Sequence, residues 1–179
     1  MNVLAVLCVF APLVMSQQVS DPTKVCLPQR FSGVAINLVT ELAANFSMDF
    51  GRQKVAAENG TIRHVIDLAK NQGYTFDAQG TCKRFTLGLS STWRQCLPSS
   101  AVFKNQLKAG LGSVRFISDL YEIPFGAKAS TRILVSKESS YSLPYLRRDT
   151  FNGQLVLTLF ANHKLGVSDP AIFNVPANC

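Results

Sequence analysis

The stretch from Gln154 to Cys179 constrains the fold of this chain more than any other part of the sequence. Between residues 154 and 160 apolar side chains occupy odd and even positions alike, with Leu155, Leu157 and Leu159 alternating with Val156, Thr158 and Phe160. This pattern predicts a strand that is apolar on both faces. Asp169 and Pro170 then predict a short helical turn that carries Ala171 to Phe173, because Asp is a good N-cap and Pro fits the first helical position. The final cysteine predicts that this end of the chain is fixed covalently.

The first sixteen residues predict a secretory signal peptide. Val3 to Met15 is an apolar run that is too short to cross a bilayer as an ordinary helix. Val14 and Ser16 suit the cleavage positions, so cleavage is expected after Ser16 and residues 17–179 are expected to form one secreted, extracellular domain. No Lys or Arg precedes the run, and an N-terminal anchor or a core helix is the alternative interpretation.

Cysteine usage agrees with secretion. Cys8 lies within the expected signal peptide, which leaves four cysteines, namely Cys26, Cys82, Cys96 and Cys179. An even number of cysteines in a secreted chain predicts two disulfides, and four cysteines allow three pairings between which the residues do not choose. The Cys-x-x-Cys spacing of a zinc site is absent from the sequence.

Short apolar or alternating segments that are separated by turn residues predict eight to ten strands and little helix. The expected strands cover residues 31–42, 45–50, 53–57, 61–68, 74–76, 82–87, 113–121, 131–136, 141–146 and 154–160. Asn59-Gly60 is the strongest turn signal and predicts a type I′ hairpin, whereas Pro144 predicts an edge or a bend. Residues 99–107 are compatible with a short helix capped by Ser100. The pattern predicts an antiparallel β-sandwich or a curved, partly closed barrel.

Many of these strands are apolar on both faces, although one face of a two-sheet protein is usually wet. A covering layer or partner is one explanation, and a cavity for an apolar ligand is another. A thick core with scattered exposed apolar residues is the third. The apolar strand positions chosen as candidates for lining a ligand pocket are Ile36, Leu38, Ile66, Phe76, Phe116, Leu157 and Leu159.

The sequence predicts no enzymatic activity and assigns no catalytic residue. His64 lies on the apolar face of an expected strand and is interpreted as a hydrogen-bonded core residue, whereas His163 is placed in a solvated turn. Neither has a carboxylate or a cysteine at a useful short spacing, and motifs for nucleophilic serine, phosphate binding and zinc hydrolysis are absent. With all four remaining cysteines expected to be oxidised, no thiol nucleophile is left.

Surface features suggest modification and possible partners. Asn45-Phe46-Ser47 and Asn59-Gly60-Thr61 satisfy the N-glycosylation pattern, and glycans are predicted at Asn45 and Asn59. The net charge is +7, but the basic residues are scattered, which favours a plain basic surface and predicts no nucleic-acid partner. No calcium-binding loop is present, and the carboxylates considered as calcium ligands are candidates by composition alone, namely Asp49, Asp77, Glu122, Glu138 and Asp169.

Four segments resemble the ependymin-related proteins, a family of secreted glycoproteins. The end of the chain, KLGVSDPAIFNVPANC, resembles the family's C-terminal signature, and CLPQRF at Cys26–Phe31 resembles its first cysteine motif. Two further segments are similar to family motifs, MDFGRQKV at Met48–Val55 and GTCKRFTL at Gly80–Leu87. The likeness covers most of the chain from Cys26 to Cys179 at low identity.

This resemblance implies two stacked, strongly curved antiparallel sheets that form a half-open barrel with a hydrophobic pocket, similar to bacterial lipoprotein carriers. It further implies a homodimer, N-glycosylation, calcium binding and cell-matrix adhesion. It also implies that Cys82 pairs with Cys179, which leaves Cys26 with Cys96. The first hypothesis is a secreted glycoprotein that binds a lipid or other apolar ligand in its β-pocket and requires no cofactor. The alternative is a calcium-dependent extracellular-matrix or adhesion protein without a small ligand.

Overall fold

The computed structural model describes residues 21–87, 93–111, 114–136, 141–177 and 179. Within these residues the protein is all-β, with two short 3-10 helices, η1 (Pro22–Lys24) and η2 (Pro170–Phe173). No helix in the described ranges is long and apolar enough to cross a membrane. The predicted signal peptide and its cleavage position lie outside the described residues.

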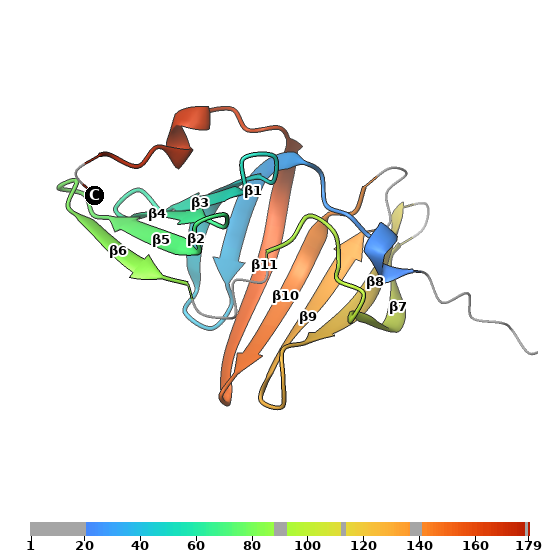
Figure 1. Ribbon diagram of the computed structural model, residues 1–179. Coiled ribbons are helices and arrows are strands. Elements are labelled where there is room, and N and C mark those ends of the chain that lie inside the picture. Colours follow the sequence, from blue (N-terminus) through green and yellow to red (C-terminus); the bar gives the residue numbers. More distant parts are fainter. Residues whose placement is uncertain (1–20, 88–92, 112–113, 137–140, 178) are drawn as a thin grey trace, which may run out of the picture.

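Eleven strands in the described ranges form one antiparallel sheet (Figure 1), in the order β6-β5-β4-β3-β2-β1-β11-β10-β9-β8-β7. The first six strands are β1 (Arg30–Asn37), β2 (Leu42–Asp49), β3 (Lys54–Glu58), β4 (Arg63–Asp67), β5 (Gln72–Phe76) and β6 (Cys82–Thr86). The other five are β7 (Val102–Leu111), β8 (Val114–Pro124), β9 (Ala129–Ser136), β10 (Pro144–Phe151) and β11 (Gln154–Leu165). The predicted all-β class is confirmed, and hydrogen bonding joins all of these strands into one sheet rather than two separate ones.

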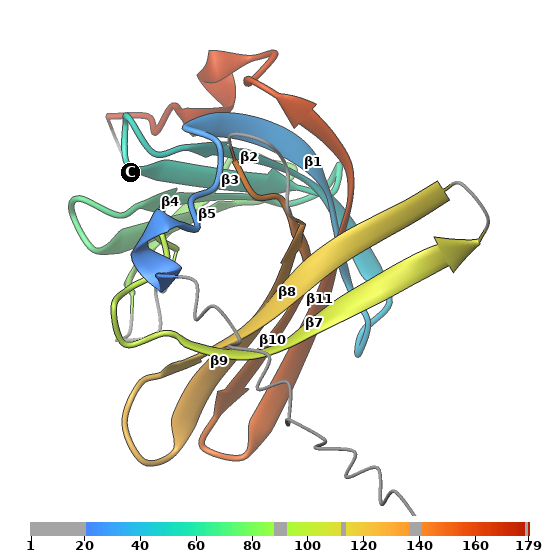
Figure 2. The ribbon, with the colours of Figure 1, turned by 90° about the vertical axis from the view of Figure 1, so that its right-hand side faces the viewer.

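Two runs of consecutive hairpins build this sheet, β1 to β6 and β7 to β11. The pairing of β1 with β11 joins the two runs, with Ala35 opposite Phe160 and Asn37 opposite Thr158 (Figure 2). Since neighbouring strands in each run are also neighbours in sequence, short turns are enough to connect most of the sheet.

Two Asn-Gly pairs in the chain form different turns. Asn152 and Gly153 both have positive φ, at 48° and 81°, which is the backbone of a type I′ turn between β10 and β11. At Asn59-Gly60 the type I′ prediction is wrong, because among these two residues only Gly60 has positive φ. There the Asn59 side chain accepts hydrogen bonds from the backbone N–H groups of Thr61 and Ile62, at 3.3 and 3.0 Å, and closes a wider loop.

The sheet has two faces, because successive side chains along a strand point to opposite sides and directly paired residues share a side. We call the face that carries Phe31, Met48 and Tyr121 the inner face. We call the face that carries Val65 and Phe76 the outer face. Each face is covered in part by a segment that contains no strand of the sheet.

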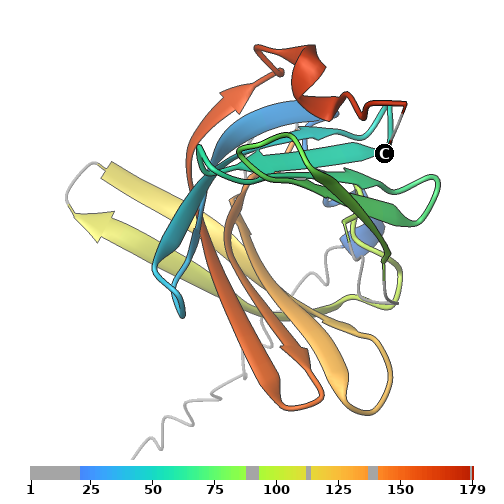
Figure 3. The same cartoon turned by 90° about the vertical axis from the view of Figure 1, so that its left-hand side faces the viewer.

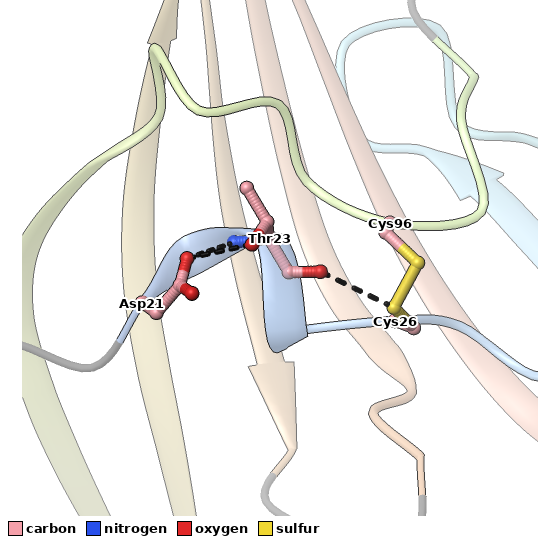
Figure 4. The surroundings of a disulfide bond; sticks show 4 residues. All are labelled: Asp21, Thr23, Cys26 and Cys96. Atoms are coloured by element: carbon pink, nitrogen blue, oxygen red, sulfur yellow. Dashed lines mark hydrogen bonds between the residues drawn. A yellow bond between two sulfur atoms is a disulfide. The ribbon is translucent and has the colours of Figure 1, made fainter.

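The inner face is covered by residues 25–28 and 93–101. Backbone hydrogen bonds join these two segments, from Leu27 N–H to the Gln95 carbonyl at 2.7 Å and from Leu97 N–H to the Val25 carbonyl at 3.0 Å. Cys26 pairs with Cys96 between them, with Cα atoms 3.9 Å apart (Figure 4). Apolar clusters lie beneath, one around Phe31, Met48 and Phe160 and another around Tyr121, Ile133 and Val135.

A buried arginine anchors the same covering segment. The guanidinium of Arg147 lies 4.2 Å from the centre of the Trp93 ring, and its Nε donates to Asp149 at 2.7 Å. Asp149 also accepts a short hydrogen bond from the Thr131 hydroxyl. Trp93 packs edge-on against Phe160, with ring centres 5.7 Å apart. This part of the inner face is therefore filled by protein side chains.

The outer face of β3, β4 and β5 is covered by the chain that follows β11 (Figure 3). Phe173, in η2, is buried against Val65, Tyr74 and Phe76. Cys179 pairs with Cys82 at the start of β6, with Cα atoms 5.6 Å apart. Both cysteine pairs implied by the resemblance are thus brought together, and each holds a covering segment on one face of the sheet.

Several predicted elements differ from the structure. Residues 99–107 do not form a helix, because Val102–Leu111 is strand β7 and pairs along its length with β8. The first predicted strand ends early, as Leu38 to Glu41 form a turn with Glu41 at positive φ. β10 runs from Pro144 to Phe151, later than predicted, and the expected bend at Pro144 is confirmed by a register shift beside it.

His163 is not in a solvated turn. It lies within β11, next to a bulge where Asn162 has a φ of 53°, and its ring contacts those of Phe31, Phe46 and Tyr145. Asn162 tolerates the left-handed backbone that the bulge requires, so the chain continues as a strand there instead of turning.

Candidate functional site

Near the β1–β2 turn, the inner face is not covered by either of the segments that cover it elsewhere, residues 25–28 and 93–101. A cavity of about 230 Å³ lies there between strands β1 to β4 and β11. Its apolar lining residues are Ala35, Leu42, Ala43, Ala44, Ala57 and Ile62, and its polar lining residues are Asn37, Thr40, Glu58, Asn59, His64 and Thr158.

Strand register places these side chains together. Ala35 is opposite Ala44, Asn37 is opposite both Leu42 and Thr158, and Ala57 is opposite His64. Directly opposed residues point to the same side of a sheet, so one patch of the inner face collects residues from five strands. Three of the central side chains are alanines, and their small size leaves the space that forms the cavity.

Large apolar side chains surround this cavity and are open to solvent. Leu42 is 62% exposed and Ile62 is 39% exposed, and both line the cavity. Val156, two residues before Thr158 on β11, is exposed as well. Exposed apolar side chains around a concave, mostly apolar surface are typical of a site that meets an apolar ligand or partner.

His64 is an ionisable group of this site, and its pKa is shifted. Burial of its ring by neighbouring residues lowers the pKa below the ordinary value of 6.5, although part of the side chain reaches solvent. Its Nδ1 lies 3.1 Å from the Thr75 hydroxyl, which confirms the predicted hydrogen bond, but the interpretation of His64 as a core residue is wrong because the residue is exposed. The lowered pKa favours the neutral ring, which suits an apolar cavity.

The seven pocket candidates from the sequence do not lie on one face. Ile66 packs against the inner-face cluster, whereas Phe76 is buried on the outer face beneath the C-terminal segment. Ile36, Leu157 and Leu159 also belong to the outer face, since Ile36 is paired with Leu159 and alternates with the inner-face residue Ala35. Leu38 is exposed in the β1–β2 turn, and Phe116 is exposed on β8 with its ring 5.5 Å from that of Tyr145.

None of these seven residues lines the 230 Å³ cavity. Strand alternation explains the difference, because a shift of one position along a strand moves a side chain to the other face. Ala35, Ala44 and Ala57 line the cavity but are too small to stand out as apolar strand positions. Alanines at matching positions of neighbouring strands are the sequence signal that could have located the cavity.

The two glycosylation candidates occupy different settings. Asn45 is exposed on the outer face in the middle of β2, and Asn59 is exposed in the β3–β4 turn. Both side chains are accessible, and the presence of glycans stays a prediction.

The carboxylates considered for calcium are dispersed. Asp49 is buried and caps a turn by accepting from Arg52 N–H at 3.0 Å, and Glu122 pairs with Lys104 and Arg132. Asp77 and Asp169 are exposed, and Glu138 lies outside the described residues. Across the described ranges, no group of three or more His, Cys, Asp or Glu side chains could hold a metal ion.

No protein-family model matches this chain, and a search of curated proteins found no significant match.

Proposed function

We propose that this protein binds a lipid or another amphipathic ligand through the uncovered end of the inner face. The observation that carries this proposal is the cavity whose walls include the exposed side chains of Leu42 and Ile62. At about 230 Å³ it is smaller than a typical site for a drug-sized molecule, which occupies roughly 300 to 1,000 Å³. The ligand would therefore be held by one apolar segment while its remainder lies over the exposed rim.

The halves of the sheet, β1 to β6 and β7 to β11, would act as the two walls of a half-open barrel in this proposal. Apolar clusters on the inner face of each half support that arrangement. The covering segment with Trp93, which Arg147 of β10 anchors, would close one end, so that the ligand enters from the β1–β2 turn. The ligand would occupy the region of the barrel where alanines leave space.

We also propose that the protein is a secreted glycoprotein of the ependymin-related family. Two cysteine pairs at bonding distance support an oxidising compartment such as the extracellular space. The motifs at Cys26–Phe31 and at the C-terminal end support the family proposal. Glycans on Asn45 and Asn59 belong to the same proposal.

The ligand proposal is tested with purified protein from secreting cells. Organic extraction followed by lipid mass spectrometry should recover a bound lipid, and a fluorescent fatty-acid probe should bind the extracted protein. Ala44→Trp, which fills the cavity, and Leu42→Asp, which places a charge at its rim, should each weaken probe binding by about tenfold or more.

Val102→Asp is the matched control, because Val102 is an exposed apolar residue of edge strand β7 that does not line the cavity. A clean extract together with no probe binding would reject the proposal. Equal probe binding by Ala44→Trp and the unaltered protein would place the ligand elsewhere.

We also propose that two copies of the protein associate through their outer faces. Five apolar residues on neighbouring strands lie directly opposite one another in one row, namely Ile36, Leu159, Leu146, Leu134 and Leu120. All five side chains are only partly buried. A continuous apolar row across five strands favours contact with a second copy of the same surface, because a two-fold axis would place the two rows face to face.

A further inference from the structure

A second and larger cavity, of about 540 Å³, lies on the outer face. Its floor is formed by β1 to β4 and its wall by the chain that follows β11. The lining consists of Ser32, Gly33, Val34, Asn45, Phe46, Ser47, Glu58, Arg63, Asn162, Lys164, Ser168, Asp169, Ala171 and Ile172. We call it the polar cleft. It lies on the opposite face from the site proposed for an apolar ligand.

One row of directly paired residues crosses the floor of the polar cleft. Val34 is opposite Asn45, Asn45 is opposite Glu58, and Glu58 is opposite Arg63. The wall is fixed to this floor, since Arg63 donates to the Ile172 carbonyl at 3.2 Å. The Asp169 carboxylate accepts from Ala171 N–H at 2.9 Å and holds the η2 turn in place. The cleft is therefore a built feature of the fold.

The charges of the polar cleft cancel. Arg63 and Lys164 supply two positive charges, and Glu58 and Asp169 supply two negative charges. The other polar side chains are amides and hydroxyls, which can donate and accept hydrogen bonds. A neutral ligand that is rich in hydroxyl and amide groups fits this lining better than a free anion or cation. Val34 and Ile172 offer apolar surface for the C–H groups of a sugar ring.

Polar groups of the polar cleft are available for a ligand. Ser47 is only 8% exposed, and within the described ranges its hydroxyl has no side-chain hydrogen bond. The side chains of Asn45, Glu58 and Lys164 likewise make no hydrogen bond or ion pair with other described residues. The Ser47 hydroxyl opens onto the cleft, where it and the other polar side chains can donate to or accept from a bound molecule.

The position of Asn45 identifies the occupant. Asn45 is the acceptor residue of the sequon Asn45-Phe46-Ser47, and its side chain lies in the floor of the cleft. A glycan on Asn45 would begin at its side-chain nitrogen, and its first sugar would lie among Glu58, Lys164 and Ile172. We propose that the polar cleft is a saccharide-binding site and that it holds the first N-acetylhexosamine of a glycan carried by Asn45.

Asn59 provides an internal comparison, because it is the acceptor of the second sequon and lies in an exposed turn beside Gly60. A Cβ atom added at Gly60 would meet nothing within 4 Å. A glycan on Asn59 starts from the exposed turn at the edge of the inner-face cavity, whereas one on Asn45 starts beside the C-terminal wall of the polar cleft.

The test is the rate at which peptide N-glycosidase removes each glycan from the native full chain made in secreting eukaryotic cells. Peptide mass spectrometry resolves the two sites. The glycan on Asn45 should be released at least ~10-fold more slowly than the one on Asn59, because it must leave the cleft before cleavage. In denatured protein the two rates should be equal.

Glu58→Ala and Lys164→Ala should each speed release from Asn45 by about threefold or more, through loss of hydrogen bonds to the sugar. Lys70→Ala, at an exposed residue of the β4–β5 turn, is the matched control and should change neither rate. Equal release from both sites of the native protein, or no effect of the two cleft variants, would overturn the proposal.

Protein that lacks a glycan on Asn45 gives the second arm of the test. Free N-acetylglucosamine and its β1,4-linked dimer would then be titrated into the protein, with backbone amide NMR shifts as the readout. Shifts at Asn45 and Ser47 that disappear in Lys164→Ala would assign the cleft to a saccharide from another molecule. No shifts at these residues would overturn the saccharide site. The second arm does not involve any residue of the inner-face cavity.

Discussion

The setting of His163 shows how one residue couples stability to pH. Its ring lies among Phe31, Phe46 and Tyr145, and its Nε2 is buried with no hydrogen-bond partner among the described residues. Burial lowers the pKa of His163 below 6.5, while a hydrogen bond to the backbone carbonyl of Pro144 raises it by less. The pKa of His64 is also lowered by burial. Both residues therefore resist protonation in the folded state.

The sign of the pH effect follows from this shift. As the pH falls below 6.5, the unfolded chain takes up protons that the folded protein does not, so the free energy of unfolding decreases. The neutral rings of His64 and His163 contribute their full share to the free energy of unfolding above pH 6.5. This contribution is lost as the pH falls through the lowered pKa values of the folded state. Thermal unfolding between about pH 7.5 and about pH 5 should show a falling midpoint.

His163→Phe is expected to reduce that dependence, because Phe fits an aromatic surrounding and does not titrate. His64→Gln provides the comparison for the more accessible histidine. A midpoint that falls equally in the unaltered protein and in the double variant would show that other groups control the acid response.

Among the structural elements, the C-terminal segment is the most informative. It contributes Phe173, which is 2% exposed, to the cluster on the outer face. Lys54 Nζ and Arg63 donate to the carbonyls of Phe173 and Ile172, at 3.5 and 3.2 Å. The Cys82–Cys179 pair then joins its end to β6 across 97 residues. The segment is thus held by burial, hydrogen bonds and a covalent link.

Replacing Cys82 and Cys179 together by Ser should lower the free energy of unfolding by about 4 kcal/mol, because the bond closes a long loop in the unfolded chain. Denaturant unfolding without a reducing agent measures this loss. Hydrogen exchange of residues 167–175 should also become faster. The matched variant replaces Cys26 and Cys96 by Ser and removes a bond that spans 70 residues. It should lose a similar amount of stability but keep slow hydrogen exchange in residues 167–175. Unchanged exchange in the first variant would contradict the role given to the bond.

Individual strands and turns also show which parts of the structure the sequence predicts well. The strand from Gln154 and the turn of helix at Pro170 are confirmed, with Asp169 as the N-cap. These signals are local, since alternation, capping and proline geometry act within a few residues. The composition of residues 99–107 suits a helix, but pairing with β8 decides the conformation from Val102 onward. The cavity was missed for a related reason, since its small alanines meet only when five strands take their register.

At the scale of the whole molecule, the proposed dimer depends on the apolar row of the outer face that runs from Ile36 to Leu120. Leu134→Arg or Leu146→Arg should convert a dimer to a monomer, because each places a charge in the centre of the row. Size-exclusion chromatography with light scattering at several concentrations measures the molecular mass. Val39→Arg, at an exposed residue of the β1–β2 turn, is the control and should leave the mass unchanged. A monomer for the unaltered protein would rule out the dimer.

The two cysteine pairs also determine what a cut in the backbone would do. Cys26 and Cys82 precede the boundary between the two runs of hairpins, and Cys96 and Cys179 follow β6. A single proteolytic nick between Thr86 and Cys96 would therefore give two fragments that stay doubly tethered and migrate together on a non-reducing gel. Adding a thiol would separate them. A nicked protein would therefore remain a two-chain molecule, with neither half lost, until both cysteine pairs are reduced.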